Sequence, residues 1–137
     1  MGIDIVSHRD EILGALEAAK LRALERIGLF VEGEAKENIT KNKSVQTGAL
    51  RNSMTHIVVE DESAVYIGTD VEYGIYVELG TGKHAETGGR PDPWVYQDDN
   101  GNWHHTHGQR AKPYLKPAVN DSKKQITAII KDELENA

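Results

Sequence analysis

Histidines are the residues whose type and spacing come closest to a chemical site in this chain. His104, His105 and His107 lie close together, and His84 and Asp92 precede them in the same irregular stretch. Imidazole nitrogens suit zinc, copper or nickel. On a strand, however, the adjacent His104 and His105 point to opposite faces. His105 and His107 can share a face, but two ligands make a weak site, and the sequence has no HExxH helical pair. We therefore expect solvated histidines and no bound metal, with a metal-dependent hydrolase using the loop histidines as the alternative.

Other catalytic patterns are missing from the sequence. Glu72 and Glu78 flank two tyrosines, but their spacing predicts no shared cleft, and we expect exposed carboxylates at the ends of elements. The segments Thr47-Gly48 and Gly80-Thr81-Gly82 lack the glycine spacing and the lysine of a phosphate-binding loop. There is no G-x-S-x-G elbow and no cysteine. We predict no catalytic residue, no cofactor and no enzymatic activity.

Charge and composition restrict the partners. The formal net charge is -6, and residues 55–80 contain no Lys or Arg. Phosphate neutralisation supplies most of the affinity of DNA-binding proteins, so this distribution disfavours specific binding of nucleic acid. A DNA-binding module is a third interpretation of what the protein does. No apolar run approaches the ~20 residues of a membrane helix, and the N-terminus lacks signal-peptide features. The lack of cysteine agrees with folding in a reducing cytoplasm.

A long amphipathic helix is predicted over residues 8–40. Ser7 stands where an N-cap is expected, and apolar side chains then recur every three or four positions. Gly28 and Gly33 lie inside this pattern, and each costs about 1 kcal/mol relative to alanine. They are either tolerated or allow a bend or a close contact with another chain. The apolar stripe consists of Ile12, Leu16, Ala19, Ala23, Ile27, Val31, Ala35 and Ile39.

Residues 54–106 are predicted to form the sheet region. Residues 55–59 and 64–68 alternate with period two around a polar turn, which predicts an antiparallel hairpin. Residues 73–79 fit a short helix or a strand. Asn100-Gly101 is a strong turn signal and predicts a second hairpin inside the long loop 81–113. We expect Trp94 and Trp103 to face each other across this hairpin as a cross-strand pair.

The last predicted element is a helix over residues 117–135, opened by Pro117. The order of helix, antiparallel sheet and helix predicts the α+β class. Because neither helix can bury its apolar stripe alone, we expect both to pack on one face of the sheet. We expect residues 1–137 to form a single domain.

Four blocks of sequence resemble those of a known family. TGALRNS (47–53) is similar to T-G-x-L-R-x-S, and YGIYVELGT (73–81) is similar to Y-A-x-Y-V-E-x-G-T. The loop segments PWVY (93–96) and GNW (101–103) with Gly108 follow, and then AKPYLKPA (111–118), which is similar to P-F-L-x-P-A. In this order the blocks resemble the gene-product-ten-like family of tailed-phage minor tail or tail-completion proteins. Gly74 replaces the usual alanine of that family, and Tyr114 the usual phenylalanine.

The resemblance implies a non-enzymatic protein at the head–tail junction of a long-tailed phage or prophage, assembled in the host cytoplasm. It implies a homo-oligomeric ring matched to the six-fold symmetry of the tail, with other neck and tail-tube proteins as partners. No catalytic residues come with the family. Gly48, Gly80 and Gly82 are expected to permit tight turns, and Pro113 and Pro117 to fix the helix entry.

Aromatic residues of the long loop are the candidates for a partner interface. Trp and Tyr are favoured interface anchors, although packing within the fold is the competing role. A ring needs a heterologous interface, in which two different patches meet. We expect the 81–113 loop to reach a neighbour or the tail tube through Trp94, Tyr96, Trp103 and Tyr114.

Overall fold

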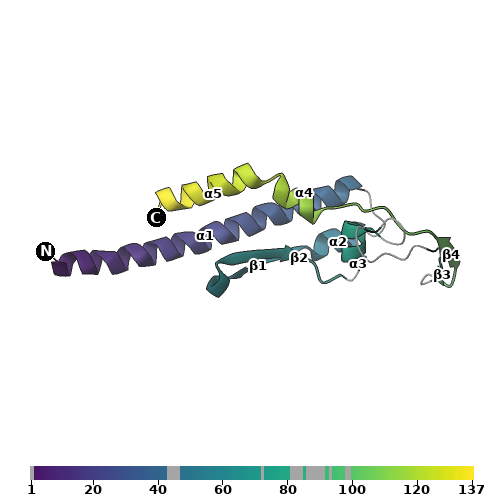
Figure 1. Cartoon of the computed structure of the whole chain (residues 1–137), viewed down its shortest axis with the longest axis horizontal. Coiled ribbons are helices and arrows are strands. Elements are labelled where there is room, and N and C mark those ends of the chain that lie inside the picture. Colours follow the sequence, from purple (N-terminus) through teal and green to yellow (C-terminus); the bar gives the residue numbers. More distant parts are fainter. Residues whose placement is uncertain are drawn as a thin grey trace.

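The axis of the fold is a single long helix, α1 (Gly2–Asn42), as the computed structural model shows (Figure 1). The structure describes residues 2–42, 47–71, 73–80, 85, 92, 94–97 and 100–137. The predicted helix is confirmed, but the chain is already helical before Ser7, so the predicted N-cap is wrong. From Ala19 to Ile39 the predicted apolar stripe is buried, whereas Ile12 and Leu16 are exposed.

A β-hairpin packs along α1. Strands β1 (Thr55–Val59) and β2 (Ala64–Gly68) pair antiparallel, as predicted, with Ile57 opposite Tyr66. A short 3-10 turn, Glu60–Glu62, joins them. Gly28 lets the helix approach the sheet closely, because a Cβ atom there would lie 2.5 Å from the ring of His56. At Gly33 a Cβ atom would meet nothing within 4 Å. The close contact at Gly28 is thus made within the chain, whereas Gly33 makes no such contact with its own chain.

The predicted helix 117–135 is divided into α4 (Leu115–Asn120) and α5 (Lys123–Glu135). Pro117 lies in the first turn of α4, where its missing N–H loses no helical hydrogen bond. The helices meet at Asp121 and Ser122, where the Asp121 amide donates to the Pro117 carbonyl at 2.8 Å and Ser122 is buried. Hydrophobic periodicity continues across this turn, which is why the sequence predicted one helix.

Helix α5 packs on α1 and not on the sheet (Figure 1). In this view α1 lies between α5 and the β1–β2 hairpin. The α+β class is confirmed, but the expectation that both helices pack on one face of the sheet is wrong. The buried face of α1 is wide enough to serve two neighbours, partly because Ala19, Ala23 and Ala35 are small.

Two short helices, α2 (Thr47–Ser53) and α3 (Tyr73–Leu79), close the core near the C-terminal end of α1. Residues 73–79, for which the sequence fitted either a short helix or a strand, form the helix α3. It ends at Gly80, which has a φ of 80° and donates its amide to the Tyr76 carbonyl at 2.8 Å, so the expected turn is confirmed. Gly48 lies within α2, so a tight turn there is wrong. Gly82 lies outside the described residues. The core cluster consists of Ile27, Val31, Ala35, Ile39, Leu50, Met54, Val77, Tyr114 and Ala118.

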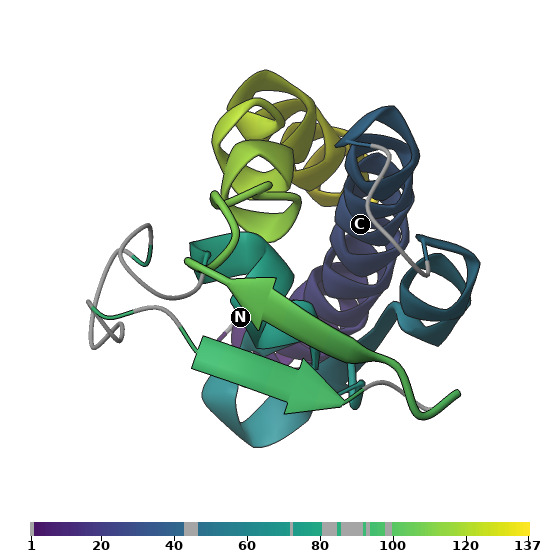
Figure 2. The same cartoon turned by 90° about the vertical axis from the view of Figure 1, so that its right-hand side faces the viewer.

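The second hairpin, β3 (Trp94–Gln97) with β4 (Trp103–Thr106), is also confirmed, and Gly101 has a φ of 86° in its turn. It pairs as a separate two-stranded sheet. It lies at the opposite end of the molecule from the start of α1, and crosses the end of the body in Figure 2. We call it the distal hairpin.

The predicted pairing of the two tryptophans is wrong. Trp94 is opposite Thr106, and Trp103 is opposite Gln97. Since side chains alternate along a strand, this register puts Trp94 and Trp103 on opposite faces of the distal hairpin.

Candidate interaction surfaces

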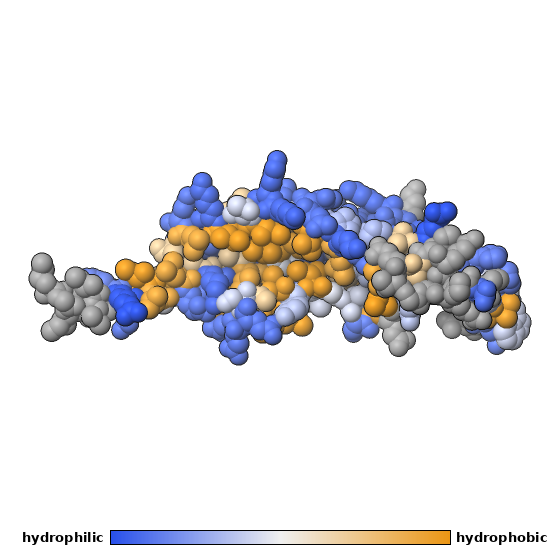
Figure 3. Space-filling view, viewed as in Figure 1, coloured by the Kyte–Doolittle hydropathy of each residue, from blue (hydrophilic) through white to orange (hydrophobic). Residues whose placement is uncertain are grey.

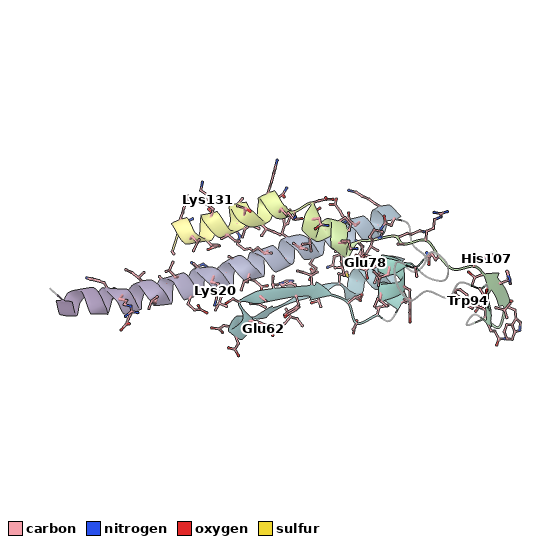
Figure 4. All side chains as sticks on the ribbon, in the orientation of Figure 1. Lys20, Glu62, Glu78, Trp94, His107 and Lys131 are labelled. Carbon is pink, nitrogen blue, oxygen red and sulfur yellow. The ribbon has the colours of Figure 1, made fainter. Side chains whose placement is uncertain are left out.

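Glu78, in the block YGIYVELGT, binds the start of the helix that follows in the block AKPYLKPA. Its carboxylate accepts hydrogen bonds from the backbone amides of Tyr114 (2.6 Å), Leu115 (3.1 Å) and Lys116 (2.9 Å) at the start of α4 (Figure 4). It pairs amides that the first turn of a helix leaves without a partner, and it places negative charge at the positive end of the helix dipole. The expected exposed carboxylate is therefore wrong for Glu78. Glu72 lies outside the described residues.

Tyr114 is buried beside this cap, with 1% of its surface exposed. Its hydroxyl donates to the Gly74 carbonyl at 2.8 Å. Burial raises the pKa of Tyr114 to about 12, so the phenol keeps its proton across the ordinary pH range. A Cβ atom at Gly74 would lie 2.8 Å from the side chain of Thr69, 2.9 Å from this hydroxyl and 3.1 Å from Leu50. The structure thus places Tyr114 in the core of its own chain, apart from the other predicted interface residues.

The segment before α4 is also attached to the body. The Lys112 amide donates to the Val77 carbonyl at 2.7 Å. The Asn42 side chain donates to the carbonyls of Lys112 and Pro113, each at 3.0 Å. Residues from α1, α2, α3 and α4 therefore meet in one junction, which holds together the two ends of the long loop.

Three of the predicted interface residues lie in the distal hairpin. Trp103 is 70% exposed, and Val95 on the same face is 60% exposed. Trp94 is half-buried, and Tyr96 lies in β3 opposite His104. Figure 4 shows this end of the molecule with Trp94 labelled. Because tryptophan is usually well buried, the exposed Trp103 is a strong candidate for a contact.

The loop histidines are only partly brought together. The rings of His105 and His107 meet edge to face, with 5.2 Å between their centroids. Both are exposed, as is His104. His84 lies outside the described residues. Among the residues that the structure describes, no three His, Cys, Asp or Glu side chains are grouped so as to hold a metal ion.

A histidine that the sequence did not single out lies between two carboxylates. Nε2 of His56 is 2.6 Å from Glu25, and its Nδ1 is 3.1 Å from Glu32, both on α1. Only a doubly protonated ring donates to both. The hydrogen bond to Glu25, more than that to Glu32, raises the pKa of His56. Burial raises the pKa of Glu32, but hydrogen bonds from His56 and Lys36 outweigh it, so that this pKa is lowered. No local pattern reveals this cluster, because its partners are 24 and 31 residues away in sequence.

The first exposed apolar surface is on the N-terminal part of α1. All side chains of residues 8–18, here called the arm, are exposed, and they include Ile12, Leu13 and Leu16. The arm is the part of α1 that extends beyond the tip of the β1–β2 hairpin and the end of α5 (Figure 1). At the hairpin tip, Lys20 donates to the Ser63 hydroxyl at 2.9 Å (Figure 4). Close to the end of α5, Leu134 lies with Ala19 around a small apolar hollow.

The second apolar surface is the side of the β1–β2 hairpin that faces away from α1. Val65 and Ile67 point inward and pack against the core. Ile57 (61% exposed) and Tyr66 (57% exposed) point outward, opposite each other. An exposed face of an antiparallel sheet is ordinarily polar, but the residues of this one are uncharged, and Glu62 at the hairpin tip accepts a hydrogen bond from the Tyr66 hydroxyl. We call it the outer face; by alternation along the paired strands it consists of Thr55, Ile57, Val59, Ala64, Tyr66 and Gly68.

The outer face continues into a hollow of about 600 Å³ beside Gly68. Ile75 and Tyr76 of α3 line this hollow and are themselves more than half exposed. Figure 3 shows how apolar residues gather along one side of the body and on part of α1, between hydrophilic regions. In the part of the chain that the structure describes, no helix is both long enough and apolar enough to span a bilayer.

One comparison with known proteins gives a match. The family described as "Bacteriophage HK97-gp10, putative tail-component" matches residues 10–80, from α1 through α3. This range includes two of the blocks that carry the resemblance, TGALRNS and YGIYVELG. No curated protein and no solved structure matches the chain. Because the family match covers just over half of the 137 residues, the chain belongs to the HK97-gp10-like family of bacteriophage tail components.

Proposed function

We propose that this tail component completes the tail at the neck and joins it to the DNA-filled head. It acts as a homo-oligomeric ring of six copies, in contact with other neck and tail-tube proteins. The family match is the observation that carries the proposal, and the four sequence blocks in family order support it. In this role the protein is a part of the virion at the head–tail junction, and it is assembled in the bacterial cytoplasm.

The exposed surfaces support a function that works through interfaces and not through catalysis. The arm and the distal hairpin project at opposite ends of an elongated molecule (Figure 1). A ring forms when two different patches of each copy meet head to tail. This chain has distinct exposed apolar patches at separate places, and two such patches could meet in a ring contact. No membrane, specific nucleic acid or catalytic residue takes part.

The distal hairpin contributes a contact to a neighbouring copy or to the tail tube. Trp103 is its exposed aromatic anchor, and Trp94 and Tyr96 belong to the same two strands. Deletion of residues 97–102 removes the turn and should abolish or strongly reduce head–tail joining. Full joining by this variant would contradict the contact.

Electron microscopy of lysates from a phage that lacks this gene tests the main proposal. Filled heads beside separate, complete tails are expected, because only the joining step is missing. A plasmid copy of the gene should restore whole virions. Intact but non-infectious virions would contradict the proposal and would mean a role after assembly.

A further inference from the structure

We infer that His56 and its two carboxylate partners form a pH-sensitive switch in the attachment of the β1–β2 hairpin to α1. When the ring loses its second proton, Glu25 is released, whereas Glu32 stays bound. The ring then holds the hairpin to α1 through one hydrogen bond in place of two. The inference is independent of the proposed function, because all of these contacts lie within a single chain.

The position of the His56 ring is fixed by its neighbours. Its side chain is 13% exposed and lies against the backbone of α1 at Gly28, where a Cβ atom would be 2.5 Å from the Cδ2 atom of the ring. The same Cβ atom would be 2.8 Å from Val65 of β2, so this side chain packs beside the ring. Because protein interiors are close-packed, the ring has little room to turn away from its partners. A change in its protonation therefore acts on the carboxylates.

The charges around the ring balance only when it is doubly protonated. Helix α1 contributes Glu25, Glu32 and also Lys36, whose Nζ atom is 3.2 Å from the second carboxylate oxygen of Glu32. Strands β1 and β2 have no charged residue besides His56, and Tyr66 of β2 is on the outer face. The imidazolium and Lys36 thus offset the two carboxylates. A neutral ring leaves one uncompensated negative charge at a site that is largely shielded from water.

The two carboxylates differ in how easily they can leave. A neutral imidazole has one N–H donor and one acceptor nitrogen, so it can donate to only one of them. Glu32 is 13% exposed and is held on its far side by Lys36, so without the ring it would be a buried charge short of a donor. Glu25 is 62% exposed and can turn into water, which replaces the lost hydrogen bond. The neutral ring therefore keeps its proton on Nδ1, toward Glu32, and Nε2 releases Glu25.

NMR of the histidine rings tests the switch in the purified full-length chain, labelled with ¹⁵N at histidine. The variant His56→Gln identifies the signals of His56 by their loss. Below the transition both ring nitrogens should have the shifts of an imidazolium, and above it only Nδ1 should stay protonated. Glu25→Gln should lower the pH of the midpoint, because it removes a negative charge that favours the imidazolium. Glu37→Gln, on an exposed part of α1, is the matched control and should leave the midpoint unchanged.

Hydrogen exchange of the backbone amides tests whether the release of Glu25 loosens the hairpin. The protection factors of β1 and β2 should fall as the pH rises through the His56 transition, whereas those of α5 should stay constant. A proton that remains on Nε2 above the transition would mean that Glu32 is released instead. A midpoint that is unchanged in Glu25→Gln, or constant protection of the hairpin, would show that the three residues are no switch. Each of these results overturns the inference and leaves the proposed function standing.

Discussion

Gly74 and Tyr114 share one small volume between α3 and α4. The hydroxyl of Tyr114 lies 2.9 Å from where the methyl group of an alanine at position 74 would be, and it donates to the Gly74 carbonyl. At both positions the chain differs from the motifs that its sequence resembles. A phenylalanine has no hydroxyl, so it would remove one of the two closest contacts of an alanine methyl group at position 74, while the contact with Thr69 at 2.8 Å would remain.

This pairing predicts that Gly74→Ala destabilises the chain by about 1–3 kcal/mol through overpacking. Tyr114→Phe alone should cost about 1 kcal/mol, because the Gly74 carbonyl loses its donor. The double variant should be more stable than the sum of the two effects by at least about 0.5 kcal/mol. Urea unfolding followed by circular dichroism measures all three. Strict additivity would show that the two residues do not compete for space.

Glu78 is the second residue with a consequence for stability. Glu78→Gln keeps the shape but removes the charge and one acceptor oxygen, so about 2 kcal/mol of unfolding free energy should be lost. Glu37→Gln, on an exposed part of α1, is the control and should change stability by less than about 0.5 kcal/mol. Equal effects in thermal unfolding would argue against the cap.

Single residues were the hardest part to predict from sequence. Glu78 follows no capping pattern, because the amides that it binds are 36 to 38 positions away. His56 has the same difficulty. Tyr114 looked like an interface residue by its type, and only the fold shows that its ring is buried.

At the scale of elements, His56 attaches β1 to α1 through charge. Its folded pKa is raised, so its contribution to stability is fully present below the unfolded value of ~6.5 and is lost as pH rises through the folded value. The pKa of Glu32 is lowered. The stability that its charged form contributes is therefore lost as the pH falls through this lowered pKa. The attachment should therefore be strongest in mildly acidic solution.

The stability difference between the natural chain and His56→Gln tests this pH dependence. It should be largest near pH 6 and should shrink as the pH is raised, because the natural chain loses its imidazolium. The unfolding free energy of both proteins between pH 5 and 9 gives the difference. A difference that grows with pH would contradict a protonated His56.

A second link between elements joins α1 to α5. Arg26 contacts the exposed Asp132 at 2.8 Å and Glu133, whose side chain is 13% exposed, at 3.0 Å, while the Arg26 side chain itself is 45% exposed. Such pairs contribute up to about 1 kcal/mol each and are screened by salt. Arg26→Ala should thus cost at most about 1–2 kcal/mol, and less at 1 M NaCl than at 50 mM, as urea titrations would show. A cost independent of salt would point to packing of the Arg26 stem.

Elements with a regular period were predicted well. Repeats of three or four gave α1, alternation gave the β1–β2 hairpin, and Asn100-Gly101 gave the distal hairpin. The predictions failed where the spacing of apolar residues carries no information. Apolar spacing does not register the turn at Ser122, and it does not say which neighbour covers a stripe, so α5 was expected on the sheet.

At the scale of the whole molecule, we expect the arm to contribute little to the stability of the body. Removal of residues 2–18 should change the unfolding free energy by less than about 1 kcal/mol, because the described side chains in this range, those of residues 8–18, are exposed. The same variant should fail to join heads to tails if the arm contacts a neighbour. Denaturant unfolding and plaque formation measure the two effects. A large loss of stability would mean that the arm packs on its own body in solution.

The candidate surfaces were only partly visible in the sequence. The lack of Lys and Arg in residues 55–80 and the apolar residues Ile12 and Leu16 were evident. That the stripe is covered only from Ala19 onward depends on where α5 and the hairpin tip end. The order of motifs gave the family, whereas the lengths of separate elements decide which surfaces are left open.

The junction around Glu78 has a consequence for how such chains can diverge. The chain leaves the body after Gly80 and returns at Lys112, and the hydrogen bonds of Val77 and Glu78 hold these two points together. Since the entropic cost of closing a loop grows only slowly with its length, we expect a change in the length of the segment between Gly80 and Lys112 to cost the body little stability. We therefore expect the body to tolerate a different insert between these two points, so that the insert can change while the packing of the body is kept.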